Sequence, residues 1–400
     1  MNIAVMGYGT VGSGVVEIIN KKDLGLNIKY ILDLRDFPGD ENEALFTKDF
    51  NDILNDESVG IVVETMGGLT PAFDFISKCL CAGKHVVTSN KELVAERGLD
   101  LLSIAKEHNV NFMFEASVGG GIPIIRPISV CLVANDIKSV NGILNGTTNF
   151  ILTRMITDNM SFETALKIAQ DKGYAEKDPT ADIEGHDACR KICILAALCF
   201  GHHVYPNEVH CEGISKITLD DVSYVSNAGD SIKLIGTAQK LKDGRLYMIV
   251  SPAVVKSTSQ LSAVSDVFNA VCVNGDATGE VVMYGKGAGR LPTASAVVAD
   301  VMDCNSHLTT RRPIDWEPPI ENNIVDYRTI PNEYYIRLNC NKSELSRLGA
   351  EFGQLKVLWR EDAPEDELAF ITEPFTENDI RAKLDKLGLS AQSLLRVAKC

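Results

Sequence analysis

A glycine-rich turn between an expected strand and an expected helix constrains the fold more than any other feature. Gly7, Gly9 and Gly12 match the pattern G-x-G-x-x-G directly after the apolar run at residues 2–6. In dinucleotide-binding folds the first glycine permits a tight turn, the second admits a pyrophosphate, and the third lets helix pack on strand. The free N–H groups of the helix start then attract the phosphates. Against the alternative of a purely structural turn, we predict a dinucleotide site formed by Gly7, Gly9, Thr10, Val11 and Gly12.

Expected strands alternate with helical stretches through the first part of the chain. The strands are predicted at residues 2–6, 28–32, 60–64, 85–88 and 110–114. Such alternation is typical of a parallel, doubly wound sheet with helices on both faces. We therefore predict an α/β protein whose N-terminal dinucleotide-binding domain spans residues 1–130.

The rest of the chain divides into three further segments. Residues 131–310 mix helices and strands in an α+β pattern, which predicts a second domain. Residues 311–331 are rich in proline and charge and are predicted to be a linker. Residues 332–400 show the order βαββαβ, which predicts a small ferredoxin-like module.

Polar residues follow two of the expected strands, where ligands bind in such sheets. Asp33 lies about twenty residues after the glycine turn, where an acid accepts ribose hydroxyls and favours NAD. Arg35 would instead pair with a 2′-phosphate and favour NADP, so the choice stays open. Lys91 follows the strand at 85–88 and is placed to reach a nicotinamide or a substrate oxygen, unless it is a surface lysine that opens a helix.

Acids are dense in the loop at residues 173–191. Glu176, Asp178, Asp182, Glu184 and Asp187 precede or begin an apolar helix. Asp187 and Lys191 are four residues apart and share one helix face. Carboxylates beside a lysine suit a substrate that carries both an ammonium group and a reactive oxygen. The carboxylates can bind the ammonium group, and the lysine can protonate a carbonyl oxygen. The alternative, acids that merely favour a helix N-terminus, explains only part of the cluster.

A second loop carries a glycine run after an expected strand. Residues 115–123 read EASVGGGIP, in which Glu115 supplies a carboxylate and the run exposes carbonyl oxygens. Such oxygens suit a hard cation, although a flexible turn has the same composition. Cysteines and histidines between residues 189 and 211 suggest zinc, but no C-x-x-C pair occurs and core packing is the better interpretation.

The composition limits the partners. The formal net charge is −15 and the isoelectric point is about 5.0, so phosphate backbones and anionic lipids would be repelled. The first residues show no basic region or cleavage site, and the apolar run at 192–200 is too short to cross a bilayer. We expect a cytoplasmic protein that binds neither nucleic acid nor membranes.

Several motifs together resemble those of homoserine dehydrogenases. They are GYGTVGSG at 7–14, TSNK at 88–91, EASVGGGIPI at 115–124, NGTTNFIL at 145–152, GYAEKDPTADIEGHDACRK at 173–191 and GKGAGRLPTASAVVAD at 285–300. The resemblance implies a Rossmann domain, a catalytic domain and a C-terminal module of ACT type. It also implies NAD(P)H-dependent reduction of L-aspartate 4-semialdehyde to L-homoserine, and the reverse, in threonine, methionine and isoleucine biosynthesis.

The resemblance assigns roles to individual residues. Lys191 matches the proton-donating lysine, Asp187 a substrate carboxylate, and Lys91 the lysine at the junction of nicotinamide and substrate. The other implied substrate residues are Glu176, Asp182, Tyr174 and Thr147. The other implied cofactor residues are Thr65, Ser89, Gly173, Glu176 and Gly287. A sodium-type cation is implied at Glu115, Val118, Gly120 and Ile122.

The resemblance also implies a homodimer or homotetramer with the middle domain as interface. The tail departs from the ACT pattern, because residues 341–344 (Asn-Lys-Ser-Glu) replace the usual acid-x-Pro-Gly turn. Whether the module binds threonine or another effector therefore stays open. Two other functions remain: a Rossmann oxidoreductase with a different amino-acid substrate, and a dinucleotide-binding sensor without catalytic activity.

Overall fold

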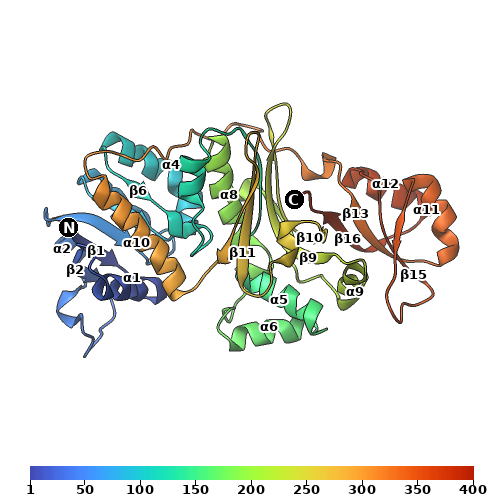
Figure 1. Cartoon of the computed structure of the whole chain (residues 1–400), viewed down its shortest axis with the longest axis horizontal. Coiled ribbons are helices and arrows are strands. Elements are labelled where there is room, and N and C mark those ends of the chain that lie inside the picture. Colours follow the sequence, from blue (N-terminus) through green and yellow to red (C-terminus); the bar gives the residue numbers. More distant parts are fainter. The chain divides into compact units, whose positions relative to one another are not determined.

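The computed structural model describes residues 1–400, which form two compact units (Figure 1). The first unit comprises residues 1–136, 193–206 and 283–320, and the second comprises residues 137–192, 207–282 and 321–400. Each unit is therefore assembled from separate stretches of sequence. This division differs from the consecutive domains predicted at 1–130, 131–310 and 332–400.

The first unit contains the predicted doubly wound sheet. Its six parallel strands follow the order β3-β2-β1-β4-β5-β6. They are β1 (Asn2–Met6), β2 (Asn27–Leu32), β3 (Phe46–Thr47), β4 (Val59–Glu64), β5 (His85–Thr88) and β6 (Phe112–Met113). The helices are α1 (Thr10–Lys21), α2 (Phe50–Leu54), α3 (Ala72–Cys81) and α4 (Lys91–Glu107). This strand order is that of dinucleotide-binding sheets.

Helix α10 (Arg290–Ser306) returns to the first unit from far along the chain. It lies beside α1 in Figure 1, as the orange helix next to the dark blue one. A Cβ on Gly14 would lie 2.9 Å from the Arg290 carbonyl oxygen and 3.0 Å from the Ala294 Cβ. Glycine at this position therefore lets the two helices approach closely, and α10 completes the core.

The segment predicted as a linker at 311–331 is packed rather than free. Trp316 is 5% exposed, and its ring lies 5.6 Å from that of Phe114 in the first unit. In the second unit, the N–H of Leu246 donates to the Asn323 carbonyl at 2.8 Å, and that of Val325 donates to Leu246 at 2.9 Å. The prolines exclude regular structure here, but aromatic burial and backbone hydrogen bonds fix the chain.

The second unit is built on a ten-stranded mixed sheet in the order β12-β11-β7-β9-β10-β16-β13-β15-β14, with β8 (His210–Cys211) also paired to β10. The strands before the C-terminal part are β7 (Ile137–Ile143), β9 (Ser231–Lys240), β10 (Leu246–Val255), β11 (Phe268–Gly275) and β12 (Gly279–Lys286). The helices are α5 (Gly146–Thr157), α6 (Phe162–Asp171), α7 (Thr180–Ile183) and α9 (Leu219–Asn227). Helix α8 (His186–Phe200) begins in this unit, and its residues from 193 onward belong to the first.

The C-terminal part of this unit has the βαββαβ order expected from the sequence. It consists of β13 (Tyr334–Asn339), α11 (Leu345–Phe352), β14 (Lys356–Leu358), β15 (Glu367–Ile371), α12 (Glu377–Leu387) and β16 (Ala391–Val397). Strand β16 also pairs in parallel with β10, so this part extends the sheet that contains β7, β9 and β10. No helix in the structure has the length and hydropathy needed to span a membrane.

Candidate active site

The glycine turn has the shape that a pyrophosphate requires. Gly7 has a φ of 96°, and a Cβ there would lie 3.0 Å from the Met66 nitrogen. A Cβ on Gly12 would lie 1.9 Å from the Gly7 carbonyl oxygen, so only glycine lets α1 approach the turn. At Gly9 an added Cβ would have open space around it. Helix α1 begins at Thr10 without a side-chain cap, which leaves its first N–H groups for an anion.

Asp33 and Arg35 form an ion pair against this turn. Asp33 Oδ2 accepts the Tyr8 N–H and Arg35 Nη2, both at 2.8 Å, and Oδ1 accepts Arg35 Nε at 2.9 Å. These bonds from Arg35 hold the pKa of the Asp33 carboxyl well below its usual range. A ribose hydroxyl would compete with Arg35 for the carboxylate, whereas a 2′-phosphate would draw Arg35 away from it.

A buried glutamate joins the carboxyl ends of β4 and β5, and the sequence analysis had not singled it out. Thr88 Oγ1 donates to Glu64 Oε2 at 2.5 Å, and burial raises the pKa of Glu64. Asn90 caps α4 by accepting the Leu93 N–H at 3.1 Å, and Lys91 is the first residue of that helix. The predicted cofactor residues at this sheet edge are Thr65, Ser89 and Lys91.

Lys191 and Asp187 form a buried pair on α8. Lys191 is 7% exposed and Asp187 is 3% exposed. Lys191 Nζ donates to Asp187 Oδ2 at 2.7 Å and to the Leu144 carbonyl at 2.8 Å. An ammonium group withdrawn from water requires such partners. The shared helix face predicted from the spacing of four residues is therefore present.

Asn145 brings Asp182 to this pair. Its Nδ2 donates to Asp182 Oδ1 at 2.6 Å and to Asp187 Oδ2 at 2.8 Å. Its Oδ1 accepts the Thr148 N–H at 2.8 Å and so caps α5. Asn145 was not among the predicted site residues, although asparagine just before a helix is typical of a cap. One amide thus gathers two carboxylates beside a lysine, an arrangement suited to an amino-acid substrate and to proton transfer.

Other residues of the acidic loop have different surroundings. Thr147 Oγ1 donates to the Tyr174 carbonyl at 2.7 Å, which holds the loop after Gly173 against the start of α5. The Tyr174 side chain is 44% exposed, and Glu176 is also exposed. Glu184 accepts the Ser215 hydroxyl at 2.8 Å. The acids therefore separate into half-buried Asp182 and buried Asp187, which Asn145 joins, and exposed acids such as Glu176 earlier in the loop.

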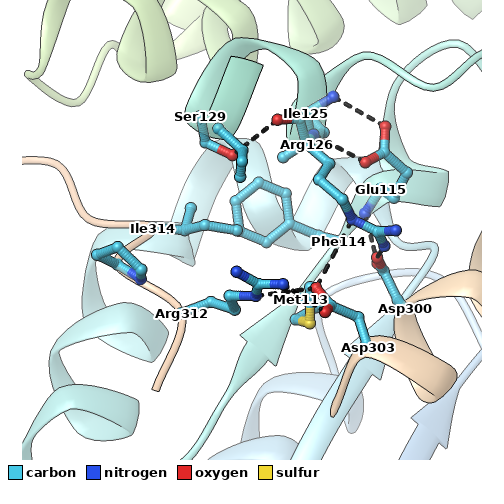
Figure 2. A pocket seen from close by; sticks show the side chains of 12 residues that line it. Met113, Phe114, Glu115, Ile125, Arg126, Ser129, Asp300, Asp303, Arg312 and Ile314 are labelled. Atoms are coloured by element: carbon cyan, nitrogen blue, oxygen red, sulfur yellow. Dashed lines mark hydrogen bonds and ion pairs between the residues drawn. The ribbon is translucent and has the colours of Figure 1, made fainter. Parts of the chain in front are cut away.

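The buried carboxylate of Glu115 organises the chain after the glycine run (Figure 2). It accepts the N–H groups of Ile124, Ile125 and Arg126 at 2.5, 2.8 and 2.9 Å. A carboxylate has about four acceptor positions, so these bonds leave room for one more ligand. Three carbonyl oxygens of the loop accept none of the backbone hydrogen bonds, and they belong to Val118, Gly120 and Ile122. The oxygen donors of this loop fit a cation.

Asp300 on α10 fixes the same loop. Its Oδ2 accepts the Glu115 N–H at 2.8 Å, and its Oδ1 accepts Arg126 Nη2 at 2.9 Å (Figure 2). Burial, and then the charge of Glu115, raises the pKa of Asp300 to about 7. A Cβ on Gly120 would lie 2.4 Å from the Gly287 carbonyl oxygen, so the loop also packs tightly on the predicted cofactor residue Gly287.

The cysteine-rich region that suggested zinc is part of the core. Cys189 and Cys193 are buried within α8. No group of three or more His, Cys, Asp and Glu side chains in the structure is arranged to hold a metal ion. A cation at the glycine run would depend chiefly on backbone oxygens.

Comparison with known proteins identifies the family. Residues 7–115 match the family described as the homoserine dehydrogenase NAD binding domain, and residues 123–302 match homoserine dehydrogenase. The homoserine dehydrogenase of Synechocystis sp. is 36% identical over 422 residues, which cover 97% of this chain and 96% of that protein. The chain belongs to the homoserine dehydrogenase family.

Other members of the family are similar to this chain in sequence and in structure. The Bacillus subtilis homoserine dehydrogenase is 42% identical over 315 residues, covering 76% of this chain and 72% of that protein. The crystal structure of a Thiobacillus denitrificans homoserine dehydrogenase has a TM-score of 0.88 at 33% identity and covers 100% of this chain and 98% of that one. A hyperthermophilic archaeal homoserine dehydrogenase in complex with NADPH has a TM-score of 0.64 at 27% identity, covering 76% and 97%. The predicted family, its oxidoreductase class and its NAD-binding domain are confirmed.

Proposed function

We propose that the protein interconverts L-homoserine and L-aspartate 4-semialdehyde with a nicotinamide dinucleotide. The observation that carries the proposal is the buried Lys191, held at 2.7 Å by Asp187, with Asp182 joined to that carboxylate through Asn145. Both compounds have an ammonium group that carboxylates can bind and an oxygen that a lysine can protonate. Membership of the family supports the same reaction.

The chain's own residues divide the chemistry between binding and proton transfer. In the reducing direction, Lys191 gives a proton from Nζ to the carbonyl oxygen, and in the oxidising direction it takes the hydroxyl proton. Asp187 keeps the ammonium group of Lys191 in position, and we assign Asp187, Asp182 and Glu176 to the substrate. Tyr174 and Thr147 shape the loop that carries Glu176.

The glycine turn and the first N–H groups of α1 hold the dinucleotide pyrophosphate. When bound, the nicotinamide ring supplies or accepts the hydride. Lys91 serves the nicotinamide side, with Thr65, Ser89, Gly173 and Gly287 as neighbours of the cofactor. Because Arg35 is paired with Asp33, an incoming 2′-phosphate must break that ion pair. A ribose hydroxyl of NAD must likewise compete with Arg35 for Asp33, so the ion pair does not choose between the two cofactors.

A sodium-type cation at the glycine run is part of the proposal. The oxygen atoms of Glu115, Val118, Gly120 and Ile122 support it, since sodium prefers oxygen ligands. The melting temperature in sodium chloride should exceed that in choline chloride at equal ionic strength. Equal melting temperatures in the two salts would contradict the cation site.

We also propose that the protein acts in threonine, methionine and isoleucine biosynthesis in the cytoplasm. Its assembly is proposed to be a homodimer or homotetramer formed through the middle region. The C-terminal βαββαβ part is proposed to be an ACT-like module. Family resemblance supports the pathway and the assembly, and the strand order β16-β13-β15-β14 supports the module.

Nicotinamide absorbance tests the reaction directly. L-Homoserine is supplied with NAD or NADP in separate assays, with L-serine and L-threonine as control alcohols. Reduction that depends on homoserine supports the proposal. Turnover of another amino acid alone would favour a different Rossmann oxidoreductase. Cofactor binding without any turnover would favour a dinucleotide-binding sensor.

A further inference from the structure

A buried arginine of the C-terminal strand is held between two carboxylates. Arg396 lies on β16, and its side chain is 6% exposed. Its Nη1 donates to Glu212 Oε2 at 2.9 Å and its Nη2 to Glu212 Oε1 at 3.1 Å. Nη2 also donates to Glu377 on α12, whose side chain is 3% exposed. Arg396 therefore ties the C-terminal module to the segment that follows β8.

Glu212 begins a short segment that presses on the acidic loop. Its N–H donates to the Val250 carbonyl at 2.8 Å. Two residues later, the Ile214 N–H donates to the Ile183 carbonyl at 2.8 Å. A Cβ on Gly213 would lie only 2.4 Å from the same carbonyl oxygen. The segment at residues 212–215 is therefore packed tightly against the acidic loop at Ile183.

The carbonyl that receives this contact lies between the two acids of the substrate site. Asp182 precedes Ile183, and Asp187 follows four residues after Ile183 in the first turn of α8. Between them, Gly185 has a φ of 84°, and its carbonyl accepts the Cys189 N–H at 2.9 Å in the first turn of α8. A displacement of the segment at 212–215 would therefore move Asp182 and the start of the helix that carries Asp187.

The ion pairs of Arg396 with Glu212 and Glu377 border a cavity, while the backbone of Arg396 pairs with β10 at Ala253. The cavity has a volume of about 770 Å³ and is lined on one side by Glu184, Glu212 and Ser215. Arg396 and Glu377 line the same cavity from the C-terminal module. The Val250 carbonyl fixes the backbone of Glu212, and His210 Nε2 lies 3.1 Å from one of its carboxylate oxygens. Arg396 supplies two further contacts of that carboxylate and connects it to the C-terminal module.

We propose that Arg396 is a positioning residue for the substrate site. It holds Glu212, Glu212 fixes the segment at 212–215, and that segment sets the distance between Asp182 and Asp187. The C-terminal module thereby acts on homoserine binding without touching the substrate. This inference rests on the function proposed above for Asp182 and Asp187.

The test compares two buried arginines of the same module. Arg396→Met removes the link to the acidic loop. Arg337→Met is the matched control, because Arg337 on β13 is 6% exposed and pairs with Asp221 and Glu367, both at 2.9 Å, but not with the loop at 212–215. Both variants lose an arginine between two carboxylates, so both should lower the melting temperature.

Steady-state kinetics distinguish the Arg396→Met variant from the Arg337→Met control. For Arg396→Met we expect the KM for homoserine to rise about tenfold or more, with a smaller fall in kcat and an unchanged KM for the dinucleotide. The rise in melting temperature caused by added homoserine should shrink in parallel. Arg396→Lys, which can reach one carboxylate at a time, should recover part of the affinity. Arg337→Met should keep the homoserine KM of the unchanged protein.

The outcomes that would overturn the inference are distinct. A homoserine KM within about twofold of the unchanged protein in folded Arg396→Met would refute it. An equal rise in the homoserine KM of Arg337→Met would show that the effect comes from general destabilisation of the module, which would also refute the inference. If Arg396→Met does not fold, Gly213→Ala decides, because its Cβ must push the Ile183 carbonyl and raise the same KM while Arg396 stays intact. Absence of homoserine turnover in the unchanged protein would instead refute the proposed function.

Discussion

Asn145 offers the sharpest test of how the substrate site is built. Asn145→Ser keeps a side-chain oxygen that can cap α5 but removes the Nδ2 that joins Asp182 to Asp187. Each lost hydrogen bond to a carboxylate is worth about 1.5–3 kcal/mol. If about half of the combined loss falls on the transition state, kcat/KM for homoserine should drop about 10- to 100-fold, since 1.4 kcal/mol is a factor of ten.

The measurements are steady-state kinetics with homoserine and fluorescence titration with the dinucleotide. Dinucleotide affinity should be unchanged, because Asn145 contacts only the acids and α5. Asn149→Ser is the matched control. Asn149 lies on the same helix and bonds to the Val264 and Phe268 carbonyls instead of the acids, so stability should fall while kcat/KM is largely kept. A normal kcat/KM for Asn145→Ser would refute the bridging role.

Three further predictions concern other parts of the chain. Gly9→Ala should weaken dinucleotide binding without changing the melting temperature, whereas Gly12→Ala should lower both, because its Cβ would lie 1.9 Å from a carbonyl oxygen; equal effects would contradict this assignment. Arg35→Ala should increase the ratio of kcat/KM with NAD to that with NADP, and a decrease would show that Arg35 does not attract the 2′-phosphate. Burial lowers the pKa of Lys233 to about 8 from 10.5, so the unfolded chain binds more protons between these values and stability rises with pH. Relative to Lys233→Met, the free energy of unfolding should gain about 2 kcal/mol between about pH 7.5 and 9.5 in denaturant titrations, and a constant difference would exclude a buried amine that loses its proton.

The local pattern of the sequence was sufficient to predict much of the fold. The β1 strand, the glycine turn and α1 follow one another within residues 2–21, and the βαββαβ order of the tail was read from periodicity alone. The strand β9 at 231–240 was missed. It carries Lys233 in a buried position, where the Val264 carbonyl accepts its Nζ at 2.6 Å. A buried lysine breaks the apolar pattern, and only the folded chain reveals its acceptor.

Contacts between distant parts of the sequence explain the remaining differences. Helix α10 packs on α1 through Gly14, although about 280 residues separate them, and no local pattern indicates that pairing. Spacing on α8 was enough to pair Asp187 with Lys191. It did not place Asp182 beside them, because Asn145 makes that link from another element. Glu64 was missed for the same reason, since its partner Thr88 lies on a neighbouring strand.

Turnover of Lys191→Met with homoserine, measured together with dinucleotide affinity, tests the central claim most directly. Lys191 contacts Asp187 and the Leu144 carbonyl, so the substitution leaves the glycine turn intact. Loss of the proton-transfer group should lower kcat by about 10²- to 10⁴-fold while dinucleotide affinity stays within about twofold. Turnover close to that of the unchanged protein would contradict the role of Lys191 and, with it, the mechanism built on α8.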